Sequence, residues 1–241
     1  LKYSLVALDI NNPSTYKIVT TNKVDGVAVL GRFDRELLSF LKKHYKNVVY
    51  TGLARIEGIN YDQVYSDGYY AAKIVINYLH QLGHTKIGYL GEVNNEVRYQ
   101  GYCDAMKSLK IPYSQKNIIE SPLSSEGGYN AVKKYLEKGK DVTALFCGND
   151  LTAIGAIKGI KESGYSIPGD LSVIGIDDID TAQYVSPMLT TVHVPLEELG
   201  KVAAKTLIDR IQDGRSLPLK VELPISLVKR ESCEQINDNT K

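Results

Sequence analysis

The chain has no tryptophan and no long apolar run, and its three cysteines cannot form a disulfide framework. Cys103, Cys147 and Cys233 lie far apart, are odd in number and contain no CxxC spacing, a usage typical of a reduced cytosolic protein. No apolar stretch approaches the roughly 18 residues of a membrane span, and no signal peptide opens the sequence. These absences predict a cytoplasmic protein without a membrane anchor.

The sequence also lacks an excess of charge of either sign. It carries 29 basic and 28 acidic residues, a formal net charge of +1. Because a domain that grips DNA usually concentrates basic residues on one face, this chain alone is not expected to hold DNA. Leu1 leads almost directly into a strand-like run at 3–8 with no initiating Met, so we expect a segment upstream of it to be missing.

Apolar β-branched runs alternate with stretches of helical period along most of the chain. In the clearest helix, Ala72, Val75, Ile76 and Leu79 fall at i, i+3, i+4 and i+7, and Gly83 follows its end. Residues 234–241 are polar and are expected to fray. Strands are predicted at 24–30, 47–50, 86–90, 117–120, 143–147, 171–176 and 190–193, with a closing pair of strands around 220–229. Helices are predicted at 36–41, 68–82, 96–109, 125–138, 150–163 and 196–212.

Strands that alternate with helices of ten or more residues indicate βαβ crossovers and mainly parallel sheets. The fold class predicted is therefore α/β, doubly wound. Such sheets bind ligands at the carboxyl ends of their strands, which directs attention to the residues that follow each strand.

Polar residues occupy several of these strand ends. Asn149 and Asp150 follow the strand at 143–147, and Asp177 follows the strand at 171–176. Asp67 precedes the long helix, and Arg98 lies just inside the helix after 86–90. Asn149 or Asp150 could simply cap the helix that follows, and so could Asp67. Together, their carboxylate, amide and guanidinium groups suit a ligand with several hydroxyls or ring nitrogens.

Nothing in the sequence forms a convincing nucleophile–base pair. The four histidines lack metal-ligand spacing and do not accompany a nucleophile elbow, and there is no phosphate-binding P-loop motif. We therefore expect no catalytic residue, no metal and no cofactor, and interpret the chain as a binding protein rather than an enzyme.

The second half of the chain carries a dense series of motifs. Those that stand out are 144–156 (ALFCGNDLTAIGA), 167–178 (IPGDLSVIGIDD), 187–192 (PMLTTV) and 228–233 (VKRESC), preceded by 83–88 (GHTKIG) and by Arg98 with Gly101 and Tyr102. In this order and spacing they resemble the lac/gal repressor (LacI/GalR) family of transcriptional regulators. The likeness spans about residues 24–233.

This resemblance implies a periplasmic-binding-protein-like (type I) fold of two lobes joined by three crossovers. The N-terminal lobe would comprise 1–81 and 195–220, and the C-terminal lobe 82–194 and 221–233, with an effector between them. Family members also carry an N-terminal helix-turn-helix and hinge of about sixty residues that reads DNA. That segment, and the first strand and helix of the N-terminal lobe, are expected to be missing here.

The resemblance also assigns ligand contacts. Asp67 would supply an acidic contact from the N-terminal lobe, Arg98 would bind ligand oxygens, and Asn149 and Asp177 would close the C-terminal side. Two positions depart from the family pattern. Leu123 stands where an aromatic often stacks on the ligand, and Val194 where a polar residue is common. Since stacking contributes much to binding a base, a sugar is favoured over a flat purine.

By the same resemblance, the chain would form homodimers and repress a carbohydrate-utilisation operon. The effector would alter the spacing of two DNA-reading segments, and so the affinity for operator DNA. Three alternatives stay open. The chain could be a periplasmic-type sugar-binding protein, or it could respond to a protein effector. The four polar contacts assigned above could also merely cap helices and pair on the surface.

Overall fold

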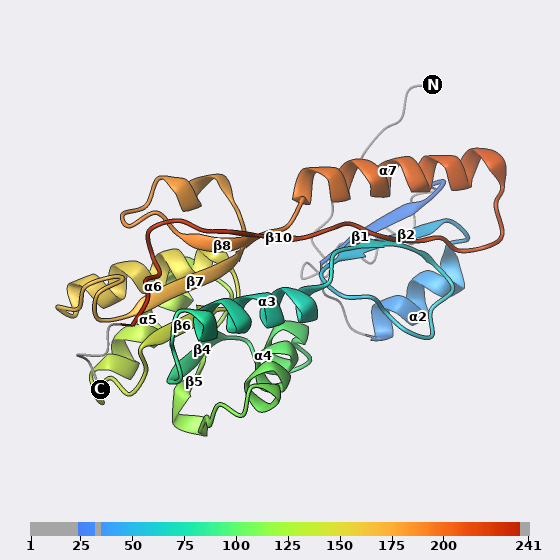
Figure 1. Ribbon diagram of the computed structural model, residues 1–241. Coiled ribbons are helices and arrows are strands. Elements are labelled where there is room, and N and C mark those ends of the chain that lie inside the picture. Colours follow the sequence, from blue (N-terminus) through green and yellow to red (C-terminus); the bar gives the residue numbers. More distant parts are fainter. Residues whose placement is uncertain (1–23, 32–34, 237–241) are drawn as a thin grey trace. The chain divides into compact units, whose positions relative to one another are not determined.

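A computed structural model describes residues 24–31 and 35–236 (Figure 1). The strand expected at 3–8 lies outside these residues, as does the tail from 237 on. The fraying expected from 234 onward is wrong at 234–236, because the Glu234 amide donates to Ser172 Oγ (3.2 Å) and the Ile236 amide donates to Leu82 O (2.9 Å). No helix within the described ranges is long and apolar enough to cross a membrane.

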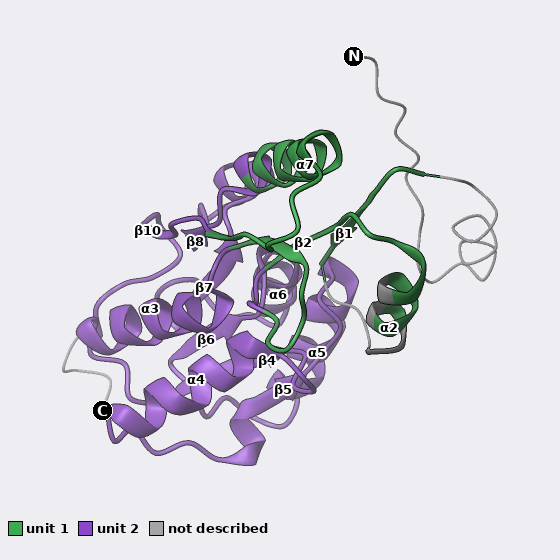
Figure 2. Ribbon diagram, turned by 90° about the vertical axis from the view of Figure 1, so that its right-hand side faces the viewer, with its two compact units in different colours: residues 1–52, 56–65, 199–221 green, residues 53–55, 66–198, 222–241 purple. Residues whose placement is uncertain are grey.

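The chain divides into two compact units, coloured separately in Figure 2. The first comprises residues up to 52 with 56–65 and 199–221, and the second comprises 53–55, 66–198 and the residues from 222 on. The lobe boundaries expected from the sequence stay a prediction. Residues 66–81, expected in the N-terminal lobe, group with the second unit.

The first unit contains a four-stranded sheet in the order β1-β2-β3-β9. Strands β1 (Val27–Leu30), β2 (Val48–Gly52) and β3 (Asp62–Tyr65) run parallel, and β9 spans Lys220–Glu222. Helix α2 (Arg35–His44) turns Leu37 and Leu41 into an apolar cluster with strand residues such as Val48. Most of the long helix α7 (Leu196–Asp213) also belongs to this unit.

Strand β3 is an element that the sequence analysis misses. Its first two residues, Asp62 and Gln63, are polar and fully buried, which the apolar-strand pattern does not anticipate. Each has partners that offset the cost of burial. Gln63 donates to Ile56 O (2.9 Å) and accepts from the Ile56 amide (2.8 Å), while Asp62 binds two arginines from distant parts of the chain.

The second unit contains a six-stranded sheet in the order β10-β8-β7-β6-β4-β5. Strands β8, β7, β6, β4 and β5 run parallel to one another, and β10 is antiparallel to its neighbour β8. The predicted α/β class with mainly parallel sheets is therefore confirmed. The strands are β4 (Ile87–Gly91), β5 (Ile118–Glu120), β6 (Ala144–Cys147), β7 (Ser172–Asp177), β8 (Thr190–His193) and β10 (Ser226–Val228).

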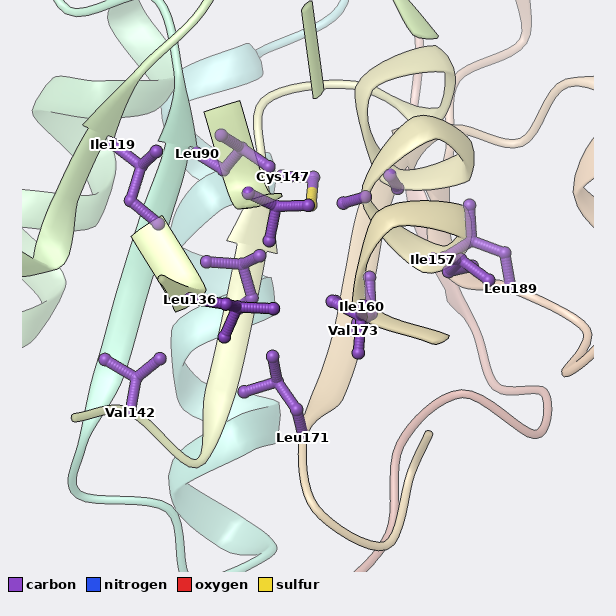
Figure 3. Close-up of a cluster of buried hydrophobic side chains, with 14 of the residues drawn as sticks. Leu90, Ile119, Leu136, Val142, Cys147, Ile157, Ile160, Leu171, Val173 and Leu189 are labelled. Carbon is purple, nitrogen blue, oxygen red and sulfur yellow. The ribbon is translucent and has the colours of Figure 1, made fainter. Parts of the chain in front are cut away.

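Helices cover both faces of this sheet. Helices α5 (Ser125–Leu136) and α6 (Asp150–Glu162) pack over an apolar cluster that includes Leu90, Cys147 and Val173 (Figure 3). Helices α3 (Gly68–Gln81) and α4 (Val97–Ser108) pack together on the other face. There, Tyr89 and Phe146 meet edge to face with ring centroids 5.4 Å apart. Neighbouring residues thus point to opposite faces, as the pleat of a strand requires.

Glycines allow α5 and α6 to pack backbone against backbone. A Cβ atom added at Gly155 would collide with the carbonyl oxygen of Ser125, and one at Gly128 would collide with the carbonyl oxygen of Thr152. Since neither obstacle is a movable side chain, a larger residue at either position would push the helices apart. The close approach fixes this helix pair as one block.

Candidate functional site

The polar strand-end residues gather at the carboxyl edge of the six-stranded sheet. Because β4, β6 and β7 are parallel, their carboxyl ends lie at the same edge. Arg98 lies in the helix after β4, Asn149 directly follows the turn after β6, and Asp177 is the last residue of β7. We call Glu96, Arg98, Leu123, Asn149 and Asp177 the edge cluster.

Arg98 is the centre of the cluster and is 7% exposed. Its Nε and Nη2 atoms donate to the two carboxylate oxygens of Glu96 at 2.7 and 2.9 Å. Its Nη1 atom donates to Gly148 O at 2.7 Å, so the side chain also ties the end of β6 to helix α4. Burial opposes the guanidinium charge, but the Glu96 carboxylate outweighs it and raises the pKa of Arg98.

Glu96 was not identified from the sequence. It is 1% exposed and caps α4, where its Oε1 atom accepts from the Arg98 amide at 3.0 Å. The same carboxylate therefore both starts the helix and neutralises the arginine inside it. The available signal was an acid two residues before the arginine, but the sequence does not show that the two side chains turn toward each other.

Asn149 caps helix α6 in the way the sequence allowed. Its Oδ1 atom accepts from the amide of Thr152 (2.9 Å) and from the hydroxyl of Thr152 (2.6 Å). Its Nδ2 atom has only a long contact, 3.5 Å, to Leu123 O. The amide nitrogen thus has donor capacity beyond the cap.

Leu123 brings apolar surface to the same place. A Cβ atom at Gly148 would lie 2.8 Å from Leu123 Cδ2 and 3.2 Å from the Tyr89 hydroxyl. The half-buried Leu123 therefore lies against the turn that carries Asn149. A side chain at Gly148 would push the end of the Leu123 side chain aside and crowd the Tyr89 hydroxyl.

Asp177 ends β7 with an unusual backbone and an unusual carboxyl group. Its φ angle is 125°, and that of Asp178 is 59°, a region that favours glycine over other residues. Burial, with help from Asp150 and Glu96, raises its pKa to about 7 against the opposing effect of Arg98. Among the described residues, none donates a hydrogen bond to this carboxylate. Asp177 can therefore accept from a ligand near neutral pH.

Asp67 lies at the start of α3, where its Oδ1 atom accepts from the Tyr70 amide at 2.9 Å. The next residue, Gly68, packs against Val97, since a Cβ atom there would lie 3.2 Å from Val97 Cγ2. Because Val97 adjoins Arg98, the beginnings of α3 and α4 are close together. Asp67 thus belongs to the same unit as the edge cluster. The ligand contacts assigned to Asp67, Arg98, Leu123, Asn149 and Asp177 stay predictions.

Two further acids hold the ends of β7 and β8. Asp150 is fully buried; it accepts from the Thr191 hydroxyl (2.6 Å) and the Ile179 amide (3.0 Å), and burial raises its pKa. Asp178 accepts from Arg230 Nη2 (2.6 Å) and lies 2.9 Å from His193 Nδ1. These partners lie far apart in sequence, so no local pattern could have revealed them. Both carboxylates are paired within the protein, so they support the site and are not expected to contact a ligand.

The edge is hollowed where β4 and β5 end. One hollow of about 260 Å³ is lined by Glu92, Glu120, Ser121 and Pro122. A second, of about 380 Å³, is lined by Glu120, Ser121, Pro122, Ser124, Glu126, Gly127, Asn130, Ala131 and Lys134, which places it beside Leu123 in the chain. Taken together, the edge offers hydrogen-bond donors, carboxylates and an apolar side chain, an arrangement suited to binding.

Comparison with known proteins gives one matching family model, a periplasmic binding protein-like domain, over residues 76–233. The chain is 34% identical over 222 residues to the HTH-type transcriptional repressor PurR of Proteus mirabilis, covering 89% of this chain. It spans 65% of the length of that relative.

Solved structures give the same picture. A LacI family transcriptional regulator from Enterococcus faecium with bound ribose is similar with a TM-score of 0.79 and 30% identity, covering 89% of this chain and 81% of that one. A second, from Enterococcus faecalis V583, also with bound ribose, has a TM-score of 0.79 and 28% identity, covering 94% of this chain and 84% of that one.

Proposed function

Because the chain belongs to the LacI family of transcriptional regulators, we propose that it is the effector-binding and dimerisation portion of a DNA-binding repressor. The family resemblance in the sequence is confirmed, and the relatives reported above are transcriptional regulators rather than enzymes. The observation that carries the proposal is the juxtaposition of Arg98 and Asp177 at the carboxyl edge of the sheet, close enough for each to shift the pKa of the other. Asn149 adds a donor beside them.

We propose that the effector is a sugar or a sugar derivative. Its hydroxyls would donate to the Asp177 carboxylate and accept from Arg98 and the Asn149 amide. Leu123 would pack against the C–H face of the sugar ring, and Val194, 2% exposed, offers no polar contact. Bound ribose in two relatives supports this class. A flat purine is the alternative, and the edge cluster supplies no aromatic ring to stack on it.

In the whole protein, effector binding would change affinity for operator DNA by favouring one conformation over another. DNA would be held by a helix-turn-helix segment outside these residues, in keeping with the net charge of +1. We propose a cytoplasmic homodimer that represses a carbohydrate-utilisation operon. Sedimentation velocity of the chain tests the dimer, and a monomer at high micromolar concentration would contradict it.

Two other functions remain distinguishable by experiment. A periplasmic-type sugar-binding protein would carry a secretion signal upstream in its gene, whereas a regulator would carry a helix-turn-helix. A regulator with a protein effector would bind no small molecule at the edge cluster. Sequencing the gene upstream of Leu1 separates the first case.

A thermal-shift screen tests the proposed effector class. The panel contains D-ribose, D-galactose, cellobiose, D-ribose 5-phosphate and purine bases. A ligand at a hundredfold excess over its Kd stabilises the folded state by about 2.7 kcal/mol, which the screen detects. The stabilisation should disappear in Asp177→Asn and persist in Glu137→Gln, an exposed acid at the far end of α5.

The outcomes separate cleanly. A sugar hit that survives Asp177→Asn would place the ligand elsewhere, and a purine hit would overturn the sugar assignment. Arg98→Ala is a poorer probe, because it leaves the buried Glu96 carboxylate without its cation and so perturbs folding as well as binding.

A further inference from the structure

The charge of Arg98 is already satisfied inside the protein. Glu96 binds it through two hydrogen bonds, and the side chains are only 8% and 1% exposed. An anionic ligand that approached this guanidinium would therefore meet an ion pair of zero net charge. Arginine at a binding site is usually a signal for phosphate or carboxylate recognition, but that signal depends on an uncompensated charge.

Arg98 nevertheless keeps donors for a neutral ligand. A guanidinium has five N–H hydrogens. Three are taken by Glu96 and Gly148 O, which leaves one on each Nη atom. Two hydroxyl oxygens can accept these hydrogens without bringing any charge to the site.

The charges that line the two hollows of the edge are negative, except for Lys134 in the second hollow. Asp177 lies close enough to Arg98 and Glu96 for the charges of both to act on its carboxylate. Glu92 and Glu120 line the hollow at the ends of β4 and β5, without a basic residue in its lining. A phosphate or carboxylate bound here would be repelled by these groups and would gain little from the neutralised arginine.

Resting on the proposed function, that an effector binds at this edge, we propose that Glu96 is a specificity-determining residue. It makes the site accept an uncharged polyhydroxylated effector and reject the phosphorylated or carboxylated form of the same molecule. Glu96 acts through Arg98, because it holds the guanidinium group in place and neutralises its charge. It is thus a positioning residue. A cap for α4 requires only one acceptor oxygen, whereas Glu96 uses both.

The first measurement needs no variant. Isothermal titration of the chain at pH 8 with D-ribose and with D-ribose 5-phosphate should show the phosphate ester binding at least about tenfold more weakly, a typical scale for like-charge rejection. Equal or tighter binding of the phosphate ester would overturn the proposal.

The second measurement removes the neutralising charge. Glu96→Ser keeps a capping oxygen, and Glu96→Gln keeps the side-chain shape; both leave Arg98 positively charged. Each should reduce the preference for D-ribose over its phosphate by about tenfold or more and should create binding of inorganic phosphate that weakens with added salt. Glu137→Gln, which removes an equal charge far from Arg98, should change neither.

Failure of the proposed function can be told apart from failure of this inference. If the wild-type chain binds no sugar, the inorganic phosphate arm still decides, because the inference requires phosphate binding in Glu96→Ser and none in the wild type. Phosphate binding by the wild type, or none by a folded Glu96→Ser variant, would overturn the role of Glu96. If neither variant folds, the comparison of the two riboses in the wild type decides alone.

Discussion

Each unit of the chain contains a buried group of charges, and the two groups differ in their balance. In the first unit, Asp62 is fully buried and meets two cations, Arg210 Nη1 at 3.1 Å and Arg215 Nη2 at 2.8 Å, while the Leu219 amide also donates to it at 2.7 Å. In the edge cluster of the second unit, one cation, Arg98, faces Glu96 and Asp177. The first group therefore has an excess of donors, and the second an excess of acceptors.

This difference separates a structural role from the binding role that we propose for the edge cluster. Both oxygens of Asp62 are engaged within the unit, and they tie β3 to α7 and to the segment before β9. In the edge cluster, Glu96 satisfies Arg98 and leaves the Asp177 carboxylate for a ligand. A buried carboxylate points to binding when the fold leaves its oxygens without donors, rather than whenever it is buried.

Breaking the Asp62 group should have the largest effect on stability. Asp62→Ala leaves Arg210, 5% exposed, without its carboxylate, which should lower the free energy of unfolding by about 3–5 kcal/mol. Urea unfolding followed by circular dichroism measures the change. A loss below about 1 kcal/mol would show that the group is not the structural clamp inferred from the pairing of both Asp62 oxygens.

Ligand affinity should respond to pH through Asp177. Its pKa is raised to about 7, so the carboxylate that we propose accepts sugar hydroxyls is lost as the pH falls below that value. The affinity for D-ribose should therefore decrease by up to about tenfold per pH unit below 7 and level off above it. Titration calorimetry from pH 5.5 to 8.5 measures this, and Asp177→Asn should bind weakly with no such slope. A flat wild-type profile would remove Asp177 from the ligand contacts.

Neutralising Asp177 should stabilise the chain modestly, the opposite of neutralising Asp62. The ordinary pKa of this carboxyl is 3.8, and in the folded chain it is about 7. Between these two pH values, Asp177 holds a proton in the folded chain that it has released in the unfolded chain. The free energy of unfolding therefore falls as the pH rises through this range. At pH 8, Asp177→Asn should therefore gain about 1 kcal/mol, less than the shift alone would give, because solvent reaches this half-buried group. At pH 4 the gain should vanish. A loss of stability at pH 8 would mean that the carboxylate is paired in the folded chain.

An exposed ion pair, Lys116–Asp141, is expected to contribute least to stability. Lys116 Nζ lies 2.8 Å from Asp141 Oδ2, but the side chains are 72% and 55% exposed. Because water and salt screen such a pair, Asp141→Asn should leave the urea midpoint unchanged within error. A clear loss would show that proximity alone, and not burial and balance, decides what an ion pair contributes.

Most of the fold could be predicted from the sequence, because it rests on local patterns. Helix α3 was expected at 68–82 and spans Gly68–Gln81, since its apolar period and Gly83 are encoded next to each other. Strand β3 was missed for the opposite reason. Asp62 reads as a surface residue until Arg210, 148 positions away, is folded against it.

The candidate site shows the same division. The rule that ligands meet the carboxyl ends of parallel strands located Arg98, Asn149 and Asp177 at one edge. It could not reveal that Glu96 neutralises the charge of Arg98, because this ion pair depends on two side chains turning toward each other. Nor could it reveal the bond between Asp178 and Arg230, which lie 52 residues apart.

The glycine contacts between α5 and α6 also limit the size of a ligand that could bind beside these helices. Leu123 lies just before α5 and Asn149 caps α6, so the backbone contact at Gly128 and Gly155 sets the separation of these two proposed ligand contacts. Loops that cannot spread give a ligand of the wrong size no room to adapt. Changes of ligand preference among related chains should then arise by exchanging the Leu123 side chain, while both glycines stay fixed.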